Sequence, residues 1–471
     1  MQGLSRLTSP GVLARIKMEN KTPGRHWGRE LFCTVEDSGF CTVKESVIVL
    51  TKVPRGTRDI LPGDIETWQF FEEKVRELCR LFGYSEIRTP IFEHTELFLR
   101  GVGEVTDIVA KEMYTFTDRG DRSLTLRPEG TASVARAYAE HKLYGDAQPI
   151  KVYYIGPMFR YDRPQAGRYR QFHQFGVEVF GTSEPTLDAE VMALSLVFFR
   201  SLGLTEFTLE INSVGCPQCR RAYRDKLQEE LKEKVDGLCP DCADRYDKNP
   251  LRILDCKNNK CQDITGDAPL MLGSLCGECD EHFTAVQEAM DALGEQYVVN
   301  PRLVRGLDYY TKTAFEIVSP VLGAQSSIGG GGRYDQLLST IGGPDVPGIG
   351  FAIGIERVLL ALEAAGTLPE AGGVLDVYVA TAGAVPAPVA LRLAMDLRGA
   401  GLAAEKDYLG RSLKAQMKYA DKKQAKFLVI LGDEEMQRGQ ATVRDMKDGS
   451  QQDVALADLV GYLAGQVKEA K

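Results

Sequence analysis

Residues 304–318 (VRGLDYYTKTAFEIV) constrain the fold of this chain more than any other stretch. The first part packs Arg305, Asp308, Tyr309 and Tyr310 together, and each of these side chains needs a hydrogen-bonding partner if it is buried. The residues from 311 onward alternate in polarity as a β-strand does. The pattern predicts a strand that begins beside a pocket for a small polar molecule. A tyrosine-rich strand on a core, with a solvated arginine, would give the same pattern.

Length and composition are typical of a soluble globular protein. The chain has 471 residues, enough for about three domains, with 44% apolar and 26% charged residues. No run of about 18 apolar residues occurs, so no membrane-spanning helix is expected. The net charge of −9 argues against a general nucleic-acid coat protein. A tRNA-type partner would have to be bound by local basic patches.

Residues 1–51 share no clear periodicity with the rest and are expected to form a poorly ordered N-terminal extension. Their start, SRLTSPGVLARIK, carries three basic residues and no acidic one. An organelle-targeting peptide has this character. We favour a dangling extension, or upstream sequence translated from a misassigned start.

Pattern changes divide the remaining chain into two domains. Residues 52–370 are expected to form a large α+β domain, which includes an amphipathic helix over 65–82 and a Cys-rich insertion at 216–292. A Gly-containing linker ends this domain. In residues 371–471 strands and helices alternate, which predicts a small α/β domain.

An arginine-rich loop lies between two predicted strands in residues 154–178. A planar guanidinium binds phosphate through two hydrogen bonds at once, so such a loop favours a polyanionic ligand. The loop's arginines are Arg160, Arg163, Arg168 and Arg170, opposed by Asp162.

Three further segments place polar side chains at the ends of predicted strands. Residues 125–131 (TLRPEGT) end in a turn that bears Glu129 and Thr131, and residues 350–357 (GFAIGIER) pass from a strand into a helix. Residues 330–335 read GGGRYD.

Taken in order, these segments resemble motifs 2 and 3 of the class II aminoacyl-tRNA synthetases, together with the turn that reads the amino acid. Residues 305–310 and 330–335 resemble the two signatures peculiar to the histidyl-tRNA synthetase family. The resemblance runs from about Val53 to the C-terminus. It implies a class II catalytic domain built on an antiparallel sheet, with the Cys-rich segment as a helical insertion and an anticodon-binding domain at 371–471.

The resemblance also implies an activity, histidine–tRNA ligation. Histidine and ATP, with Mg²⁺ on its phosphates, would give histidyl-adenylate and pyrophosphate, and the histidyl group would pass to the 3′ end of tRNA(His). Because the first step brings two anions together, fixed positive charge is its main electrostatic need. By resemblance, Arg160 and Arg305 supply that charge at the α-phosphate. ATP would also be bound by Asp162, Arg168 and Arg357, and histidine by Glu129, Gly130, Thr131, Gln174, Glu178, Tyr309, Tyr310 and Tyr334.

Some of these residues have structural interpretations that stay open. Glu129 is placed to cap a helix that starts near Thr131, and Glu178 could pair with an arginine of the loop. Two positions depart from the family pattern. Asp162 stands where a glutamate is common, which puts its adenine contact in doubt, and Gln336 stands where glycine is frequent.

Eight of the eleven cysteines fall in four close pairs, too clustered for a disulfide framework. Three pairs have the CxxC spacing that lets two thiolates face one metal, and the fourth is looser. Four pairs suffice for two tetrahedral Zn²⁺ sites, and reduced thiols without metal are the alternative. The pairs are Cys216 and Cys219, Cys239 and Cys242, Cys256 and Cys261, and Cys276 and Cys279.

A basic stripe is predicted on one helix face of the last domain, at Arg411, Lys414, Lys418, Lys422 and Lys426. Solvated surface helices often look like this. Since the domain resembles an anticodon-binding module, we expect the stripe to contact tRNA.

The expectation is therefore a cytoplasmic enzyme, and the resemblance implies a homodimer whose interface is built by the motif 1 helix around residues 70–90. A non-catalytic relative, the synthetase-like regulatory subunit that binds histidine for a biosynthetic transferase, is the alternative. That relative typically lacks the C-terminal module and has eroded signatures. This chain keeps both the module and the signatures.

Overall fold

The computed structural model describes residues 14–18, 29–35, 41–47, 51–103, 106–322, 326–368 and 375–469. The chain divides into two compact units. The first contains the residues up to 60 with 79–196 and 206–360, and the second contains residues 61–78 and 197–205 with the chain after 360. Within the described ranges, no helix has both the length and the apolar character needed to cross a bilayer.

The prediction for residues 1–51 lies largely outside the described residues. Those that are described form a three-stranded antiparallel sheet, which the sequence pattern did not predict. Its order is β1 (Ala14–Met18), β2 (Arg29–Val35), β3 (Cys41–Val47).

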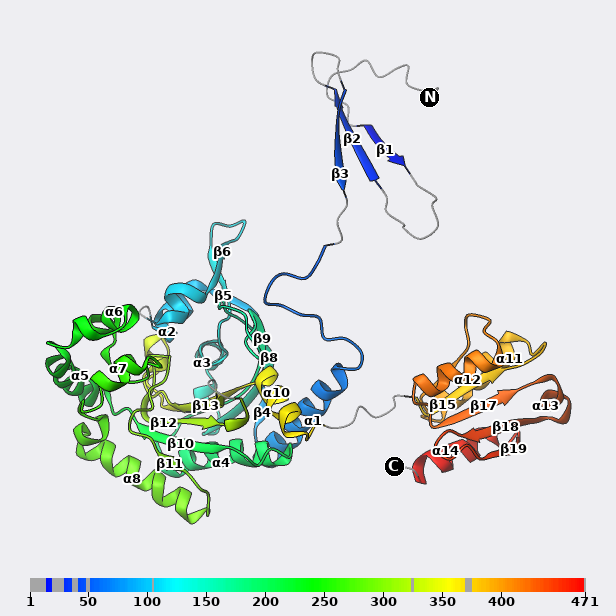
Figure 1. The fold of residues 1–471 in the computed structure, drawn as a ribbon. Helices are drawn as coiled ribbons and strands as arrows, with labels where there is room; N and C mark the ends of the chain where they lie inside the picture. The colour runs from blue at the N-terminus through cyan, green and yellow to red at the C-terminus, as the bar shows by residue number, and fades with distance from the viewer. Residues whose placement is uncertain are drawn as a thin grey trace. The chain divides into compact units, whose positions relative to one another are not determined.

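An eight-stranded sheet forms the centre of the first unit (Figure 1). Its six inner strands are all antiparallel, and the short strand at each edge pairs in parallel. This matches the antiparallel catalytic sheet predicted from the sequence. In spatial order the strands are β11 (Val298–Val299), β10 (Thr208–Ser213), β12 (Thr311–Val318), β13 (Ser327–Arg333), β14 (Gly348–Gly354), β9 (Gln171–Phe180), β8 (Ile150–Phe159) and β4 (Ser85–Glu86).

Helices cover both faces of this sheet. Successive side chains of β8 point to opposite faces, and each face meets a different helix. Val152 and Tyr154 pack in one cluster with residues of α3 (Thr131–Glu140). On the opposite face, Lys151 forms an ion pair with Glu190 of α4 (Pro185–Ser201). Helix α10 (Ile355–Ala365) follows β14 directly.

A second, three-stranded sheet leads the chain into α3. Its order is β5 (Phe92–His94), β7 (Ser123–Leu126), β6 (Tyr114–Thr117), and β7 ends just before Glu129. Helix α2 (Thr95–Val102) and a π-helical turn (Ile108–Glu112) lie between β5 and β6 in the chain.

The Cys-rich segment is helical, as predicted. It contains α5 (Pro217–Leu231), α6 (Pro240–Lys248), α7 (Asn259–Ile264) and α8 (Gly277–Ala292) (Figure 1). Four cysteines belong to its own buried cluster, together with Tyr223, Leu227 and Leu231. The insertion therefore has a separate small core to which sulfur contributes.

A buried ion pair ties α4 to the central sheet. Arg333, at the end of β13, and Asp188 are both fully buried, and the guanidinium Nε lies 3.1 Å from Asp188 Oδ1. Asp188 also accepts hydrogen bonds from Thr313 Oγ1 (2.6 Å) and His282 Nε2 (2.9 Å). Burial opposes ionisation of Asp188, but the His282 hydrogen bond and the Arg333 charge outweigh it and lower its pKa.

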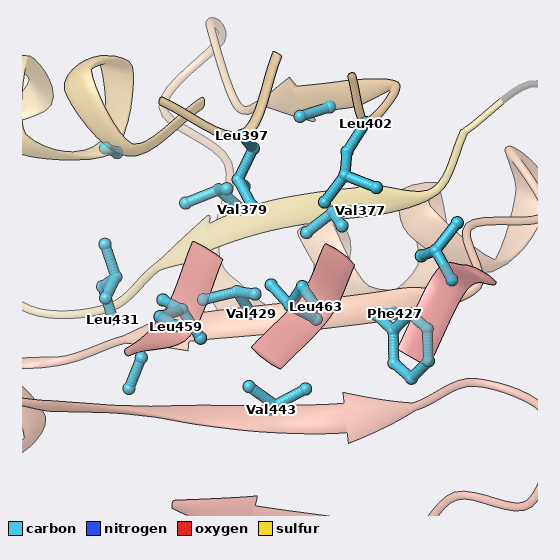
Figure 2. Close-up of a cluster of buried hydrophobic side chains, with 14 residues drawn as sticks. Val377, Val379, Leu397, Leu402, Phe427, Val429, Leu431, Val443, Leu459 and Leu463 are labelled. Carbon is cyan, nitrogen blue, oxygen red and sulfur yellow. The ribbon is translucent and has the colours of Figure 1, made fainter. Parts of the chain in front are cut away.

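The second unit contains a small α/β sheet, which matches the prediction for the last domain. Odd-numbered residues of its central strands, such as Val377 and Val429, pack against Leu397, Leu459 and Leu463 (Figure 2). The strands, in spatial order, are β16 (Ala404–Lys406), β15 (Val377–Thr381), β17 (Phe427–Leu431), β18 (Gln440–Asp445) and β19 (Gln451–Ala455). The helices are α11 (Ala387–Gly399), α12 (Leu413–Lys422), α13 (Asp433–Arg438) and α14 (Leu459–Glu469).

Even-numbered residues of the same strands face the other way. Tyr378 and Leu428 pack with Ala420 of α12, whereas α11 and α14 share the first face. Also in this unit, Phe71 of α1 (Ile65–Leu81) makes an edge-to-face contact with Phe198. The helix predicted over 65–82 therefore forms, ending one residue earlier.

The substitution Asp188→Asn should lower the free energy of unfolding of the first unit by about 3 kcal/mol, because it removes the fully buried counter-ion of Arg333 and leaves only the partly exposed Asp335, 3.2 Å away. Urea unfolding monitored by far-UV circular dichroism would measure this. As a control, Glu96→Gln breaks an ion pair between exposed side chains and should change stability by less than about 1 kcal/mol. Equal effects of the two substitutions would contradict the importance of the buried pair.

Candidate active site

A cavity of about 190 Å³ lies at the start of β12, where residues 305–310 enter the sheet. This is where the polar cluster predicted a pocket. Eight of its lining residues are site residues predicted from the sequence: Glu129, Thr131, Arg160, Gln174, Arg305, Tyr309, Tyr310 and Tyr334. The structure therefore brings together side chains that lie more than 200 positions apart in the chain.

Glycines on β13 and β14 make room for these side chains. A Cβ on Gly330 would lie 2.9 Å from Nη1 of Arg305, and a Cβ on Gly350 would overlap the Glu178 carboxylate. Gly130, which was predicted as a site residue, also leaves room for a neighbouring side chain, because a Cβ there would overlap the ring of Tyr154. At these three positions glycine is required by close approach.

Glu129 caps helix α3 and also lines the cavity. Its carboxylate accepts hydrogen bonds from the backbone N–H groups of Thr131 (2.7 Å) and Ala132 (2.9 Å). The capping interpretation is therefore confirmed. It does not exclude a role in binding, since a carboxylate has about four acceptor positions and this one faces the cavity. Burial raises the pKa of Glu129.

Glu178 lies behind the cavity wall rather than among its lining residues. Its carboxylate accepts hydrogen bonds from Thr131 Oγ1 (2.7 Å) and from the hydroxyl of Tyr334, and both of those residues do line the cavity. The alternative in which Glu178 pairs with an arginine of the loop is not what the structure shows. Burial raises its pKa to about 8, although both hydrogen bonds act in the opposite direction.

Two guanidinium groups face the cavity from different segments, Arg160 directly after β8 and Arg305 in the turn before β12. Arg160 Nε donates to the backbone oxygen of Pro128 (2.8 Å), and the group lies over the ring of Phe172. Arg305 Nη1 donates to Glu316 (2.7 Å). Burial lowers the pKa of Arg160, whereas at Arg305 the Glu316 charge outweighs burial and raises it. Both groups remain cationic.

Two buried polar atoms beside the cavity have no partner within the described residues. They are Nε of Arg305, a donor, and Oε1 of Gln174, an acceptor. Leaving such atoms unpaired costs about 1–3 kcal/mol each, so their position indicates that a ligand completes the site.

Aromatic rings form one wall of the cavity. The ring of Tyr309 lies 4.8 Å from that of Tyr310 and 5.7 Å, edge to face, from that of Tyr334. A flat, partly polar ligand fits between such rings and their hydroxyl groups.

The other residues predicted for ATP lie outside the cavity lining. The Asp162 carboxylate accepts hydrogen bonds from Arg168 Nη1 (2.9 Å) and from the N–H of Arg163 (2.6 Å). Arg357 Nε donates to the backbone oxygen of Ser327 (2.7 Å). Their assignment to ATP stays a prediction.

Sequence reasoning missed several wall residues. Ile108, Leu307, Phe351 and Ala352 line the cavity, and Glu316, on β12, accepts a hydrogen bond from Arg305. Glu316 had a detectable signal, an acidic residue on the same predicted strand. Leu307, Phe351 and Ala352 lie within the segments singled out in the sequence but were assigned no role, and Ile108 had no signal, because apolar side chains at such spacing are ordinary core.

The basic stripe is shorter than predicted. Helix α12 ends at Lys422, so Arg411 and Lys426 lie off the helix, and the prediction of one face for all five was wrong for these two. Arg411 pairs with Asp407 (3.1 Å) and Lys426 with Asp376 (2.8 Å). The exposed basic residues that remain on the predicted face are Lys414, Lys418 and Lys422.

The raised pKa of Glu178 predicts a pH effect on stability. Between the ordinary value near 4.5 and about 8 the folded state holds a proton that the unfolded state has released, so stability falls as pH rises through this window. The Glu178→Gln side chain has no proton to lose. Between pH 5.5 and 8.5 its free energy of unfolding, measured in urea, should therefore fall by about 2 kcal/mol less than that of wild type. The exposed Glu184→Gln is the control. Parallel pH dependence of wild type and Glu178→Gln would contradict the raised pKa.

Comparison with known proteins identifies the family. Residues 56–358 match the family model for "Histidyl-tRNA synthetase" and residues 376–466 match "Anticodon binding domain". A histidine–tRNA ligase from Desulforamulus reducens is 61% identical over 416 residues, which cover 88% of this chain and 99% of that protein.

Solved structures agree with this match. The apo histidyl-tRNA synthetase of S. aureus superposes with a TM-score of 0.76 at 42% identity, over 88% of this chain and 100% of that one. A Bacillus halodurans protein titled as an ATP phosphoribosyltransferase regulatory subunit/histidyl-tRNA synthetase gives 0.59 at 25% identity, over 82% and 99%. Given these matches and the cavity described above, the chain belongs to the histidyl-tRNA synthetase family.

Proposed function

We propose that the cavity beside residues 305–310 is where this chain, a histidine–tRNA ligase, joins L-histidine to ATP. One observation supports this placement above the others. Arg160, Arg305 and the Glu129 carboxylate line the same cavity. Such a set of charges suits a ligand that carries both an ammonium group and reacting anions.

In the first step a carboxylate oxygen of histidine attacks the α-phosphorus of ATP, and the bond to the pyrophosphate oxygen breaks. Arg160 and Arg305 would offset the charge that gathers on the α-phosphate, in a half-buried site where fixed charges act strongly. In the second step a ribose hydroxyl at the 3′ end of tRNA(His) attacks the acyl carbon, and AMP leaves.

Histidine would be recognised at both ends. Glu129, Thr131 and Gln174 would receive the α-ammonium group, for which the unpaired Gln174 Oε1 provides an acceptor. Tyr309, Tyr310 and Tyr334 would enclose the imidazole ring. Glu178 would act through Thr131 and Tyr334, whose hydroxyl groups it orients.

Metals have two proposed places. Mg²⁺ would enter with the ATP phosphates, where it neutralises their charge. The cavity lining offers one carboxylate, Glu129, so most of the metal's oxygen ligands would come from the phosphates and water. Zn²⁺ is proposed for the Cys-rich insertion, where two groups of four cysteines have the geometry of metal ligands.

We also propose a cytoplasmic homodimer. Exposed apolar side chains at Leu81, Ile91 and Phe92 support an interface near the predicted segment, because a monomer gains nothing from leaving them in water. The cysteines of the described residues whose side chains are placed are all free thiols, which fits a reducing compartment.

Histidine-dependent ATP–pyrophosphate exchange tests the activity and the role of Arg305. Wild type should exchange. Arg305→Ala should lose about 10²-fold or more in rate, the effect of removing one fixed charge-stabilising group, while equilibrium dialysis shows histidine binding within about threefold of wild type.

Glu316→Gln is the matched control for this substitution. It weakens the ion pair but leaves the guanidinium in place, and it should retain most of the exchange rate. Near-normal exchange by Arg305→Ala would contradict the role of Arg305. Wild type that binds histidine without exchange would favour the regulatory function instead.

Charge reversal on α12 tests the tRNA-binding face. The double substitution Lys418→Glu with Lys422→Glu should weaken tRNA(His) binding and reduce the slope of log K against log salt by about 1–2. Filter binding at several salt concentrations measures both. The exposed pair Lys447→Glu with Lys468→Glu, in the same unit, is the control for net charge. Equal losses in the two variants would contradict a localised tRNA contact on α12, and pyrophosphate exchange should stay unchanged in both.

A further inference from the structure

The four sequence-adjacent pairs of cysteines form two separate clusters of four. The cluster made by the two middle pairs lies, in sequence, inside the cluster made by the first and last pairs. The outer cluster joins the first pair to the last: Cys216, Cys219, Cys276 and Cys279. The inner cluster joins the two middle pairs: Cys239, Cys242, Cys256 and Cys261. The outer cluster therefore fastens the beginning of the insertion to its end, and the inner cluster fastens its middle.

The sulfur spacing is that of a metal site. All four Sγ atoms of each cluster lie within 4.8 Å of one another, with 3.6 Å between Cys216 and Cys219 and 3.9 Å between Cys239 and Cys256. Four sulfurs at the usual zinc–sulfur distance of about 2.3 Å, placed at the corners of a tetrahedron, are about 3.8 Å apart. A disulfide would need about 2.0 Å, and all eight cysteines are free.

Backbone donors surround the sulfur atoms as they do around bound metals. The N–H of Cys239 donates to Cys261 Sγ (3.2 Å), and the N–H of Cys276 donates to Cys219 Sγ (3.1 Å). Both bonds link one pair of a cluster to the other pair. Donors in this position orient the ligands and offset the negative charge that four thiolates place around a divalent cation. A tetrahedral set of four sulfurs selects zinc among the common divalent ions.

The insertion also holds the segment that carries the tyrosines. Arg220 follows the outer-cluster ligand Cys219, and its Nη1 donates to the backbone oxygens of Asp308 (3.0 Å) and Tyr310 (2.9 Å). Asn249, at the end of the helix that starts at the inner cluster, donates to Asp308 Oδ1 (2.6 Å). The backbone on both sides of Tyr309 is thus held by a side chain next to a metal ligand.

We propose that each cluster binds one zinc ion, and that the outer zinc positions residues 308–310 through Arg220 and so sets the affinity for histidine. The positioning step rests on the proposed function, in which Tyr309 and Tyr310 contact histidine. Arg220 is a positioning residue: it is absent from the cavity lining and acts through the backbone it binds.

Metal analysis of the purified full-length protein tests the sites. Wild type should contain two zinc ions per chain, and exchange into Co²⁺ should give a tetrathiolate absorption spectrum. Cys276→Ser with Cys279→Ser should retain one zinc, as should Cys256→Ser with Cys261→Ser. Cys79→Ala, which removes a buried thiol outside both clusters, should retain two. Wild type without stoichiometric metal and without the cobalt spectrum would overturn the sites.

Substitution of Arg220 tests the coupling without disturbing a metal ligand. Arg220→Met should retain two zinc ions and raise the KM for histidine in pyrophosphate exchange about tenfold, because two charge-assisted hydrogen bonds to the loop are lost. The KM for ATP should stay within about twofold. Arg220→Lys, which keeps a cationic donor, should recover part of the histidine affinity.

Each result separates the coupling from the proposed function. Unchanged histidine KM in Arg220→Met, or equal increases in the KM for histidine and ATP, would overturn the coupling while the ligase activity stands. A wild-type protein with two zinc ions but no histidine-dependent exchange would overturn the proposed function and, with it, the coupling, but not the metal sites.

Discussion

The candidate active site depends on glycines in β13 and β14, which carry no side chains. Gly330, Gly348 and Gly350 leave the space that Arg305, Tyr334 and Glu178 occupy, and a Cβ at any of the three would meet the corresponding side chain. The antiparallel register sets these glycines beside the residues that approach from β9 and from the turn before β12. The cavity thus forms where glycines leave the surface of the sheet without side chains, so that long polar side chains from other segments can approach its backbone.

A bare sheet is costly to hold in shape, because glycine loses more conformational freedom on folding than other residues and contributes no packing. The Asp188–Arg333 pair lies at the end of the glycine-rich β13 and fixes that end to α4. Asp188, a residue of α4, accepts hydrogen bonds from Thr313 of β12 and Arg333 of β13 and also contacts His282 of α8. One buried carboxylate therefore connects the sheet to the helix that carries the last cysteine pair.

Much of this arrangement could be predicted from local patterns. The alternation of polarity correctly predicted both ends of β12. The arginine-rich loop lies between two strands, β8 and β9, as expected. Gln336, where glycine is frequent in the family, has a φ of −100°, so it needs no glycine. These features depend on a few neighbouring residues, which is why sequence alone was sufficient.

Other features depend on long-range geometry and could not be predicted. The sequence did not show that Glu129 would cap α3 and still face a cavity, or that Glu178 would sit one layer behind the ligand. The pairing of cysteines in two clusters was equally open, since four pairs allow several combinations. Arg411 and Lys426 have the right spacing for the α12 stripe, but the helix is too short to include them and nearby carboxylates hold both.

The insertion explains how a loop as polar as residues 305–310 can keep one conformation. Leu307, Tyr309 and Tyr310 pack in apolar clusters, and the N–H of Asp308 donates to the backbone oxygen of Val102 (3.3 Å). Further hydrogen bonds come from Arg220, on α5, and from Asn249, which directly follows α6, and both helices begin at cysteine clusters. Those helices have a small core of their own, in which sulfur takes the place of larger apolar side chains. In a core of that size the proposed zinc ions would supply much of the rigidity. The shape of the cavity is therefore set partly by groups outside its lining.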